Sequence, residues 1–209
     1  MTNIKKMIFM FGLLFLSACG TMPQENYNYI HQVPADQILE SEFQLLEKRP
    51  PRMTLQEGQV DFSFSKNSPL LKTEQGPAPA ATVRFVNENS GKFLVVWSWL
   101  HKASFAKVGV VFPKLSVYDS TKSLRKIKIV QEGEEDSCGI FRCRKMAYDI
   151  SELEKGTYQL VLVATVADPE KSLMLSEINT GTLYPLQVPV YADYFGDLRI
   201  SLQSVLPFP

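Results

Sequence analysis

Cysteine and histidine are the residue types from which metal sites and many catalytic sites are built, and this 209-residue chain holds only five of them. The cysteines are Cys19, Cys138 and Cys143, and the histidines are His31 and His101. Neither histidine has a cysteine or an acid at ligand spacing, so we interpret both as surface residues and predict no metal site. The chain also lacks the G-x-S-x-G, H-E-x-x-H and glycine-rich phosphate-loop motifs. We therefore expect a protein that is not an enzyme and has no resident cofactor.

The segment before Cys19 has the layout of a secretory signal peptide. Lys5 and Lys6 precede an apolar stretch, residues 7–16, which is too short to cross a bilayer as a helix. The sequence "LSAC" at residues 16–19 resembles the lipobox of bacterial lipoproteins, whose cysteine receives a diacylglycerol group and becomes the new N-terminus. We expect a signal peptide over residues 1–18 and diacylglycerol and N-acyl chains on Cys19. The alternative is an ordinary signal peptide with an incidental cysteine.

A lipid on Cys19 would set the compartment of the mature chain. Two or three acyl chains hold a protein on a bilayer durably, because each buried methylene contributes about 0.8 kcal/mol. Gly20, and not an aspartate, follows the cysteine, which by resemblance to bacterial sorting rules favours the outer membrane. We expect an anchor on the periplasmic side of the outer membrane and a partner among envelope proteins. The net charge of zero gives no indication of nucleic-acid binding, which needs a concentrated basic face.

The two remaining cysteines, Cys138 and Cys143, form an even pair in a compartment that is oxidising. Four residues separate them, which suits the two ends of a hairpin loop, so we predict a structural disulfide. A redox-active pair is the alternative, although such pairs are usually spaced C-x-x-C. The neighbouring acidic run, Glu132–Asp136, lacks the alternating oxygen ligands of a calcium loop and is expected to be solvated.

The first residues of the mature chain are expected to form a lipidated cysteine and a flexible tether, residues 19–35, since this stretch has no periodicity and contains two prolines. A short amphipathic helix and a linker are predicted for residues 36–52, with Asp36 as the N-cap. Leu39, Phe43 and Leu46 recur at helical spacing and are candidate partner-binding residues. Their apolar stripe either packs on the chain's own domain or docks on another envelope protein.

Residues 53–209 alternate between apolar and polar side chains in short runs separated by turn residues. Two runs, "KFLVVWSWLH" and "TYQLVLVATV", are apolar on both faces, as in strands covered on each side. We predict an all-β fold, a two-sheet antiparallel β-sandwich, with a closed barrel as the alternative. The long connection that contains Pro185 and Pro189 is not expected to hold a central strand.

Aromatic residues are the remaining indication of a ligand site. Trp97 and Trp99 share one face of a predicted strand and are expected to belong to the core. Tyr191, Tyr194 and Phe195 cluster in the polar stretch "PVYADYFGD" and are candidate sugar-stacking residues. A carbohydrate is therefore a second possible partner.

Four blocks of the sequence are similar to the periplasmic proteins of the maltose operon, the MalM family: "NSPLLKTEQGPAPAATVRFVNENSGKFLVVWSWLHK", "VVFPKLSVYDSTKSLRKIKI", "GTYQLVLVATVADPEKS" and "NTGTL…FGDLRISL". The resemblance covers roughly residues 55–205. It implies a periplasmic β-sandwich lipoprotein near carbohydrate uptake, and it transfers no catalytic residue. The family's lysine and serine before the strand at Ala81 are replaced here by "GPAPAA".

Two functions follow from these observations. The first is a non-enzymatic, lipid-anchored envelope protein that acts as a binding or assembly module. The second is a carbohydrate-binding accessory protein linked to the uptake of maltodextrin or another sugar.

Overall fold

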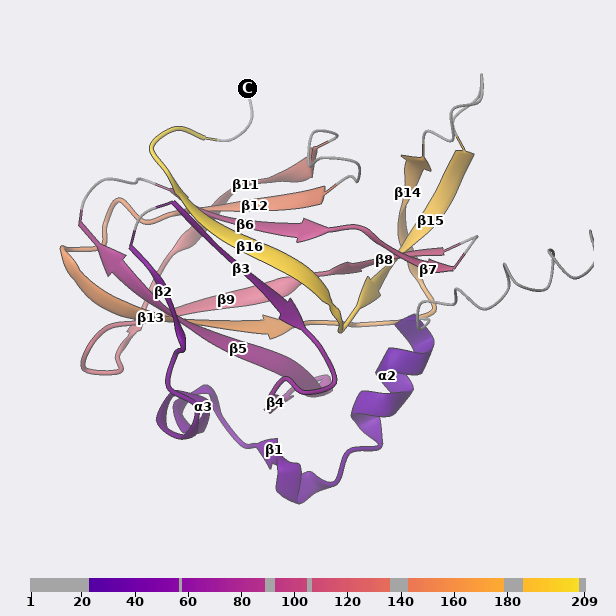
Figure 1. The fold of residues 1–209 in the computed structure, drawn as a ribbon, viewed down its shortest axis with the longest axis horizontal. Helices are drawn as coiled ribbons and strands as arrows, with labels where there is room; N and C mark the ends of the chain where they lie inside the picture. The colour runs from indigo at the N-terminus through magenta and orange to yellow at the C-terminus, as the bar shows by residue number, and fades with distance from the viewer. Residues whose placement is uncertain are drawn as a thin grey trace, which may run out of the picture.

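The computed structural model describes residues 23–56, 58–88, 93–104, 107–135, 143–178 and 186–206. These residues are mostly β-strand and form three sheets, with two short α-helices near the start of the described chain. The predicted all-β sandwich is confirmed. Figure 1 shows the two larger sheets facing each other, and the smaller sheet extending from one end of them.

The largest sheet has seven strands, six of them in the order β1-β4-β5-β13-β9-β10. The seventh, β2, also pairs with β5, at residues further along β5 than those that pair with β4. Its central strands, β5 and β13, pair antiparallel from Ala80 opposite Val163 to Asn87 opposite Gly156. Both strands are long, and most of their residues are buried or half-buried, as in strands covered on each face; β13 is rich in valine and leucine, and β5 in alanine and valine. The strands are β1 (Ile38–Leu39), β2 (Met53–Leu55), β4 (Leu70–Thr73), β5 (Gly76–Asn87), β9 (Pro113–Tyr118), β10 (Leu124–Arg125) and β13 (Gly156–Ala164).

The second sheet has five strands, all antiparallel, in the order β11-β12-β6-β16-β3. Its strands are β3 (Gln59–Phe64), β6 (Phe93–Trp99), β11 (Lys128–Glu135), β12 (Cys143–Asp149) and β16 (Gly196–Gln203). Alternate residues of these strands face the seven-stranded sheet, in agreement with the predicted period of two.

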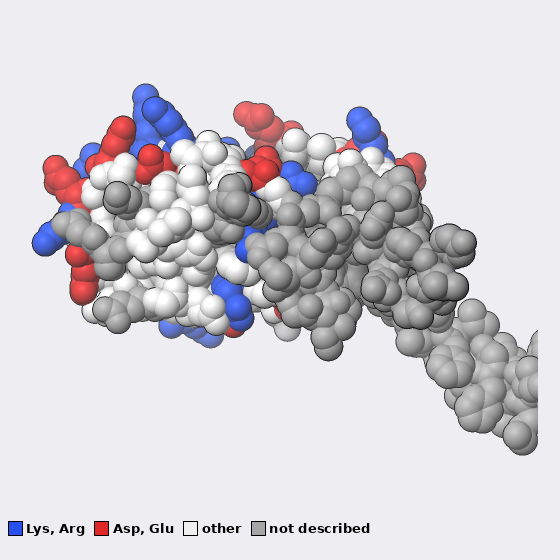
Figure 2. Space-filling view, turned by 90° about the horizontal axis from the view of Figure 1, so that it is seen from above, with Lys and Arg blue, Asp and Glu red and all other residues white. Residues whose placement is uncertain are grey.

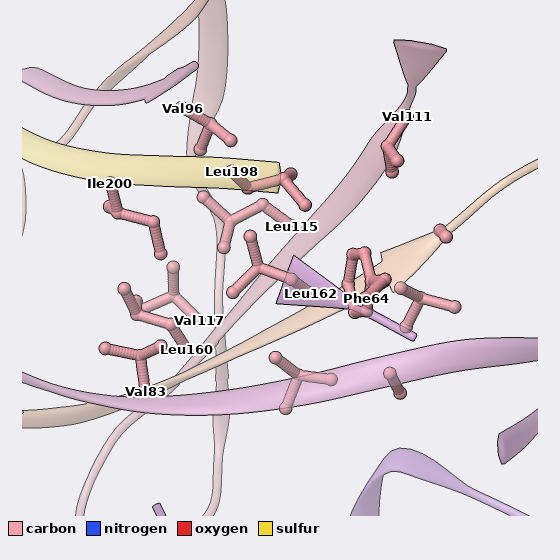
Figure 3. Close-up of a cluster of buried hydrophobic side chains, with 14 of the residues drawn as sticks. Phe64, Val83, Val96, Val111, Leu115, Val117, Leu160, Leu162, Leu198 and Ile200 are labelled. Carbon is pink, nitrogen blue, oxygen red and sulfur yellow. The ribbon is translucent and has the colours of Figure 1, made fainter. Parts of the chain in front are cut away.

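The core lies between these two sheets. Figure 3 shows side chains of the five-stranded sheet pointing toward side chains of the seven-stranded sheet, and the labelled residues are all buried. The five-stranded sheet contributes Phe64, Val96, Leu198 and Ile200. The seven-stranded sheet contributes Val83, Leu115, Val117, Leu160 and Leu162. This packing removes the apolar faces of both sheets from water and is the main source of stability of a sandwich.

The third sheet has four strands in the order β14-β15-β8-β7 and is built from extensions of strands in the larger sheets. The strand β7 (His101–Ser104) continues β6, β8 (Lys107–Val111) leads into β9, and β15 (Leu186–Asp193) leads into β16, while β14 (Ser172–Ile178) lies at the edge. A small apolar cluster of Leu100, Val108, Val110, Val188 and Val190 stabilises this sheet.

The expectation that Pro189 excludes a central strand is wrong, because Pro189 lies within β15 between two neighbouring strands. The register explains how the proline is accommodated. Pairing of β15 with β8 begins one residue later, at Val190, so Pro189 has only β14 beside it. Its missing N–H group therefore costs no ladder hydrogen bond on the β8 side.

The prediction of a flexible tether up to residue 35 is wrong for its described part. Residues Pro23–His31 form the helix α2, whose Ile30 is fully buried against the core, and a 3-10 turn follows at Ala35–Gln37. The buried face of α2 consists of Pro23, Asn26 and Ile30. Because a polar residue stands at the centre of this face, a search for apolar periodicity does not detect the helix.

The short helix predicted within residues 36–52 exists but is shorter than expected. The helix α3 spans Glu42–Lys48, and its N-cap is Ser41, whose Oγ accepts a hydrogen bond from the backbone N–H of Gln44 at 3.3 Å. The prediction of Asp36 as the N-cap is therefore wrong, since Asp36 lies in the preceding 3-10 turn.

Candidate functional site

Three polar residues from distant parts of the chain meet where the sandwich joins the four-stranded sheet. Asn26 comes from α2, His101 is the first residue of β7, and Asp193 is the last residue of β15. We call these three residues the polar junction. Figure 1 shows α2 beside the place where β8, β15 and the start of β16 converge.

Asp193 is the centre of the polar junction, and its side chain is completely buried. The Nδ2 group of Asn26 donates to both carboxylate oxygens, at 2.8 and 3.1 Å. Nε2 of His101 lies 3.0 Å from Oδ2, and the backbone N–H of Phe195 donates to Oδ1 at 3.3 Å. Burying a carboxylate is costly unless it is well hydrogen-bonded, so these donors make the position of Asp193 tolerable.

Two glycines make room for the imidazole ring of His101. Gly109 of β8 pairs with His101 on one side and with Tyr191 on the other. A Cβ atom at Gly109 would overlap the His101 ring and would lie 2.9 Å from Oδ2 of Asp193. Gly196 has a φ of +156°, and a Cβ there would lie 3.1 Å from Nδ1 of His101. The close approach of His101 to Asp193 therefore requires glycine at position 109.

The pair of His101 and Asp193 resembles the histidine and carboxylate of a catalytic triad. Whether His101 could act as a base therefore depends on what lies beside its other ring nitrogen, Nδ1. With Nε2 donating to Asp193, a neutral ring presents the lone pair of Nδ1. Nδ1 is buried, and it has no hydrogen-bond partner among the described residues. No nucleophilic side chain of the described ranges is therefore held at this nitrogen, as a histidine base would need. The arrangement fits a structural role, which is to hold α2, β7 and β15 together.

Aromatic rings complete the docking of α2. The Tyr27 ring stacks on the His31 ring with centroids 4.1 Å apart, and it lies parallel to the Tyr194 ring at 5.9 Å. Burial, with a smaller contribution from Tyr27, raises the pKa of the Tyr194 phenol to about 12. Burial lowers the pKa of the His31 imidazole below its usual 6.5. Gly76, with a φ of +110°, lets the β4–β5 hairpin approach the edge of the His31 ring.

The predicted sugar-stacking residues do not form one exposed platform. Tyr194 is buried, with 1% of its surface exposed, so its assignment as a stacking residue is wrong. Tyr191 and Phe195 are half-buried. Tyr194 is buried because the chain turns there from β15 into β16 and α2 covers the turn, which the local polar sequence does not indicate.

The predicted partner-binding stripe is not presented as one surface either. Leu39 lies in β1 and pairs with Leu71, Leu46 is buried, and only Phe43 is exposed, with the Lys122 ammonium 4.5 Å from its ring. The helix α3 begins after Leu39, so the three residues cannot share a helix face. Its buried residues are Leu45 and Leu46, which pack on the chain's own core.

The expectation that Trp97 and Trp99 belong to the core is wrong. Because Val96 faces the core, its neighbours on β6 face outward, and both tryptophans are half-buried there. The ammonium of Lys145 lies 3.9 Å from the Trp97 ring, and the guanidinium of Arg199 lies 5.1 Å from the Trp99 ring. Burial lowers the pKa of Lys145. These cations occupy ring faces that a stacked sugar would need.

Arg199 is itself paired. Its guanidinium donates to both carboxylate oxygens of Asp61, at 2.6 and 3.0 Å, and these hydrogen bonds lower the pKa of Asp61. Figure 2, which looks onto the molecule from above, shows acidic and basic side chains interspersed over the described part of that face. A single-sign field of the kind that nucleic acids require is not visible on it.

Several predicted residues lie at or beyond the limits of the described chain. Cys143 is fully buried at the start of β12 and is disulfide-bonded, but Cys19 and Cys138 lie outside the described residues, so the pairing with Cys138 stays a prediction. Glu132 of the acidic run pairs with Arg144. Within the described ranges, no group of three or more His, Cys, Asp or Glu side chains is arranged to hold a metal ion.

The polar junction is the part of the molecule that sequence reasoning missed. His101 was expected on the surface because no acid lies near it in sequence, yet Asp193 reaches it from 92 residues away. No local pattern reports such a contact. The sequence does offer one signal, the glycine at position 109 between valines of β8, since a glycine inside a strand indicates a close approach of another group.

Comparison with known proteins gives this chain no relative: no family model, no curated protein and no solved structure matches it. Among the described residues, the search for a membrane-spanning segment also found no helix of sufficient length and apolar character.

Proposed function

We propose that this chain is a lipid-anchored, periplasm-facing envelope protein that acts as a binding or assembly module and is not an enzyme. The observation that supports this function most directly is the lipobox-like "LSAC" at residues 16–19, behind a basic and then apolar segment. The structure adds that the first described residue, Pro23, already belongs to a helix and lies only four residues after Cys19. A mature chain that starts at Cys19 therefore loses nothing of the described domain.

A non-enzymatic role is supported by the chemistry of the polar junction. In the histidine–carboxylate pair described above, Asp193 accepts from Asn26 of α2 and from the backbone N–H of Phe195 and pairs with His101 of β7, and no nucleophilic side chain of the described residues is held there. Burial raises the pKa of the Tyr148 and Tyr194 phenols to about 12, and both tyrosines belong to the hydrophobic core.

The test of the anchor is a comparison of two cysteine variants in the native host. We expect Cys19→Ser to move the protein from the membrane fraction to the soluble fraction, because without the thiol the residue cannot receive the diacylglycerol group. Cys138→Ser is the matched control, since it leaves the lipobox intact, and it is expected to remain with the membrane. Mass spectrometry of the mature N-terminal peptide should find a diacylglycerol-modified, N-acylated Cys19. An unmodified N-terminus at Met1 or at Cys19 would overturn the proposal.

A carbohydrate-binding accessory function is the second candidate, and two observations favour it. The sequence blocks similar to the MalM family suggest a place near sugar uptake, and Tyr191 and Phe195 keep part of their rings exposed. Titration calorimetry of the mature domain with maltodextrins and a panel of other glycans tests it. Binding that is lost in Phe195→Ser would support this function, and the absence of heat across the panel would count against it.

A further inference from the structure

Two aromatic rings and a lysine form an exposed cluster at one end of the domain: Tyr29, Phe195 and Lys66, which we call the aromatic–lysine patch. Tyr29 is 39% exposed although it lies on a docked helix. The ammonium of Lys66 lies 4.8 Å from the centroid of the Tyr29 ring, and the Phe195 ring lies 6.3 Å from it at a tilt of 60°. Lys66 and Phe195 therefore both lie near the Tyr29 ring, and all three side chains are at least partly exposed.

The patch joins three elements at the same end of the sandwich. Tyr29 belongs to α2, Lys66 follows the end of β3, and Phe195 precedes the start of β16. The register confirms this placement, since Phe64 of β3 pairs with Gly196 of β16. The opposite end of the sandwich contains Asn87 and Gly156, at the far end of the β5–β13 pair.

The distance from this end to Cys19 is limited by covalent geometry. Three residues separate Cys19 from Pro23, so the two Cα atoms can be at most about 14 Å apart. Tyr29 lies six residues further along α2, about 9 Å along its axis. The helix cannot serve as extra tether while Ile30 and Asn26 are buried on the domain. A lipid on Cys19 thus keeps the patch within reach of the bilayer surface.

We propose that the aromatic–lysine patch rests on the phosphate-bearing headgroup layer of the bilayer that holds the Cys19 lipid; this inference rests on the proposed lipid anchor. Tyrosine rings are enriched at the headgroup level of membranes, where one end of the ring is apolar and the other is wet. The Lys66 ammonium is attracted to lipid phosphates. The end of the sandwich at Asn87 and Gly156 then points away from the membrane and is free to meet a partner in the periplasm.

The experiment uses the mature, lipidated chain in vesicles of phosphatidylethanolamine with a minority of phosphatidylglycerol and a headgroup spin-labelled lipid. A fluorophore is attached at Asn28→Cys, next to the patch, or at Lys155→Cys, at the opposite end, both of which are exposed positions. We expect quenching at position 28 to be about threefold stronger than at position 155, because of the short reach from Cys19. Equal quenching at the two positions would overturn the proposed orientation.

A variant with a longer tether shows how much of the quenching at position 28 is due to the patch and how much to the short tether. Insertion of about twelve Gly and Ser residues before Pro23 gives the domain a root-mean-square freedom of roughly 20 Å. We expect the label at position 28 to stay quenched in this variant while the patch is intact. We expect the quenching to fall to the level of position 155 when Tyr29→Ser and Lys66→Gln are added. Loss of quenching with the patch intact would show that the patch has no affinity for headgroups.

Two controls distinguish the possible failures. Lys66→Gln alone removes only the charge and is expected to give an intermediate result with an unchanged thermal midpoint, so a folding defect cannot explain it. Mass spectrometry of Cys19 is done on the same samples: an unlipidated cysteine overturns the proposed anchor, whereas a lipidated chain with equal quenching overturns only the orientation. If the patch variants lose binding to a glycan and keep their quenching, the patch is a sugar site and the proposal is wrong.

Discussion

Between its two large sheets the protein buries aliphatic side chains that need only shape and hydrophobicity. At the polar junction it buries a carboxylate and an amide, and a half-buried imidazole pairs with the carboxylate. Each aliphatic residue of the core contributes on its own and has many replaceable neighbours. Each member of the polar junction depends on a few specific hydrogen-bond partners, and removing one of them leaves a polar group without its partner. We infer that packing of the core determines whether the chain folds. The polar junction then determines whether α2 and the four-stranded sheet are held against the sandwich.

The largest effect is expected in the core. Leu162 is fully buried between the sheets, and Leu162→Ala should lower the free energy of unfolding by about 3–4 kcal/mol through lost burial and a remaining cavity. Chemical denaturation followed by circular dichroism measures the change. Leu124→Ala is the matched control: this leucine is 61% exposed, and its loss should change stability by less than about 0.5 kcal/mol. Similar losses in the two variants would mean that the sheets do not pack face to face as described.

A smaller effect, with a different spatial pattern, is expected at the polar junction. In Gly109→Ala the new methyl group overlaps His101 and crowds Asp193, so the free energy of unfolding should fall by about 2–3 kcal/mol. Gly156→Ala is the control, because a Cβ there meets nothing closer than 3.9 Å. Nuclear magnetic resonance should show shifts in Gly109→Ala that concentrate on α2 and β15. An unperturbed His101 ring in this variant would contradict the close approach.

These two predictions also show what sequence reasoning can and cannot find. Period and hydrophobicity are local properties of the sequence. The alternation in β3 and β16 therefore indicates strands with one buried face, and the apolar runs of β6 and β13 indicate strands covered on both faces. The sandwich and most of its strands were therefore predictable. The pairing of His101 with Asp193 and the docking of Asn26 depend on where distant segments meet, which only the three-dimensional arrangement defines.

Helix α2 illustrates the same limit within one segment. Its sequence, "PQENYNYIH", contains one aliphatic residue, Ile30, and the remaining buried face is made by Pro23 and Asn26. A helix that docks through one aliphatic side chain, an amide–carboxylate contact and stacked rings has no amphipathic pattern to detect. This polar composition led to the prediction of a flexible tether. Because no helix was expected there, Tyr194 was also not expected to be buried beneath one.

Asn26→Ala tests the amide–carboxylate contact with a still smaller effect. Removing the Nδ2 donor leaves Asp193 with fewer partners, and we expect a loss of about 2 kcal/mol in the free energy of unfolding. Gln24→Ala is the control on the same helix, since Gln24 hydrogen-bonds only to the exposed Asn28 among the contacts described. Limited proteolysis should cut Asn26→Ala near α2 at rates well above those of the control. Equal cleavage of the two variants would show that the contact does not hold the helix.

The smallest predicted effect depends on pH and on the Tyr194 phenol. Its pKa is raised from 10.0 to about 12 in the folded protein, so the folded state binds this proton more tightly than the unfolded state. The contribution to stability is complete below pH 10 and is lost as the pH rises toward 12. Thermal melts at pH 9 and pH 11 should show a drop that is reduced in Tyr194→Phe. An equal drop in both proteins would assign the effect to other groups.

The packing of α2, Pro23–His31, on the sandwich places the described domain only four residues after Cys19. Hydrogen–deuterium exchange of the mature, membrane-extracted protein tests this packing most directly. We predict that amides in the second half of α2, from Tyr27 to His31, exchange far more slowly than an unstructured peptide, and that Asn26→Ala removes this protection while the β5–β13 pair stays protected. Exchange of these α2 amides at the unstructured rate in the wild-type protein would contradict the account.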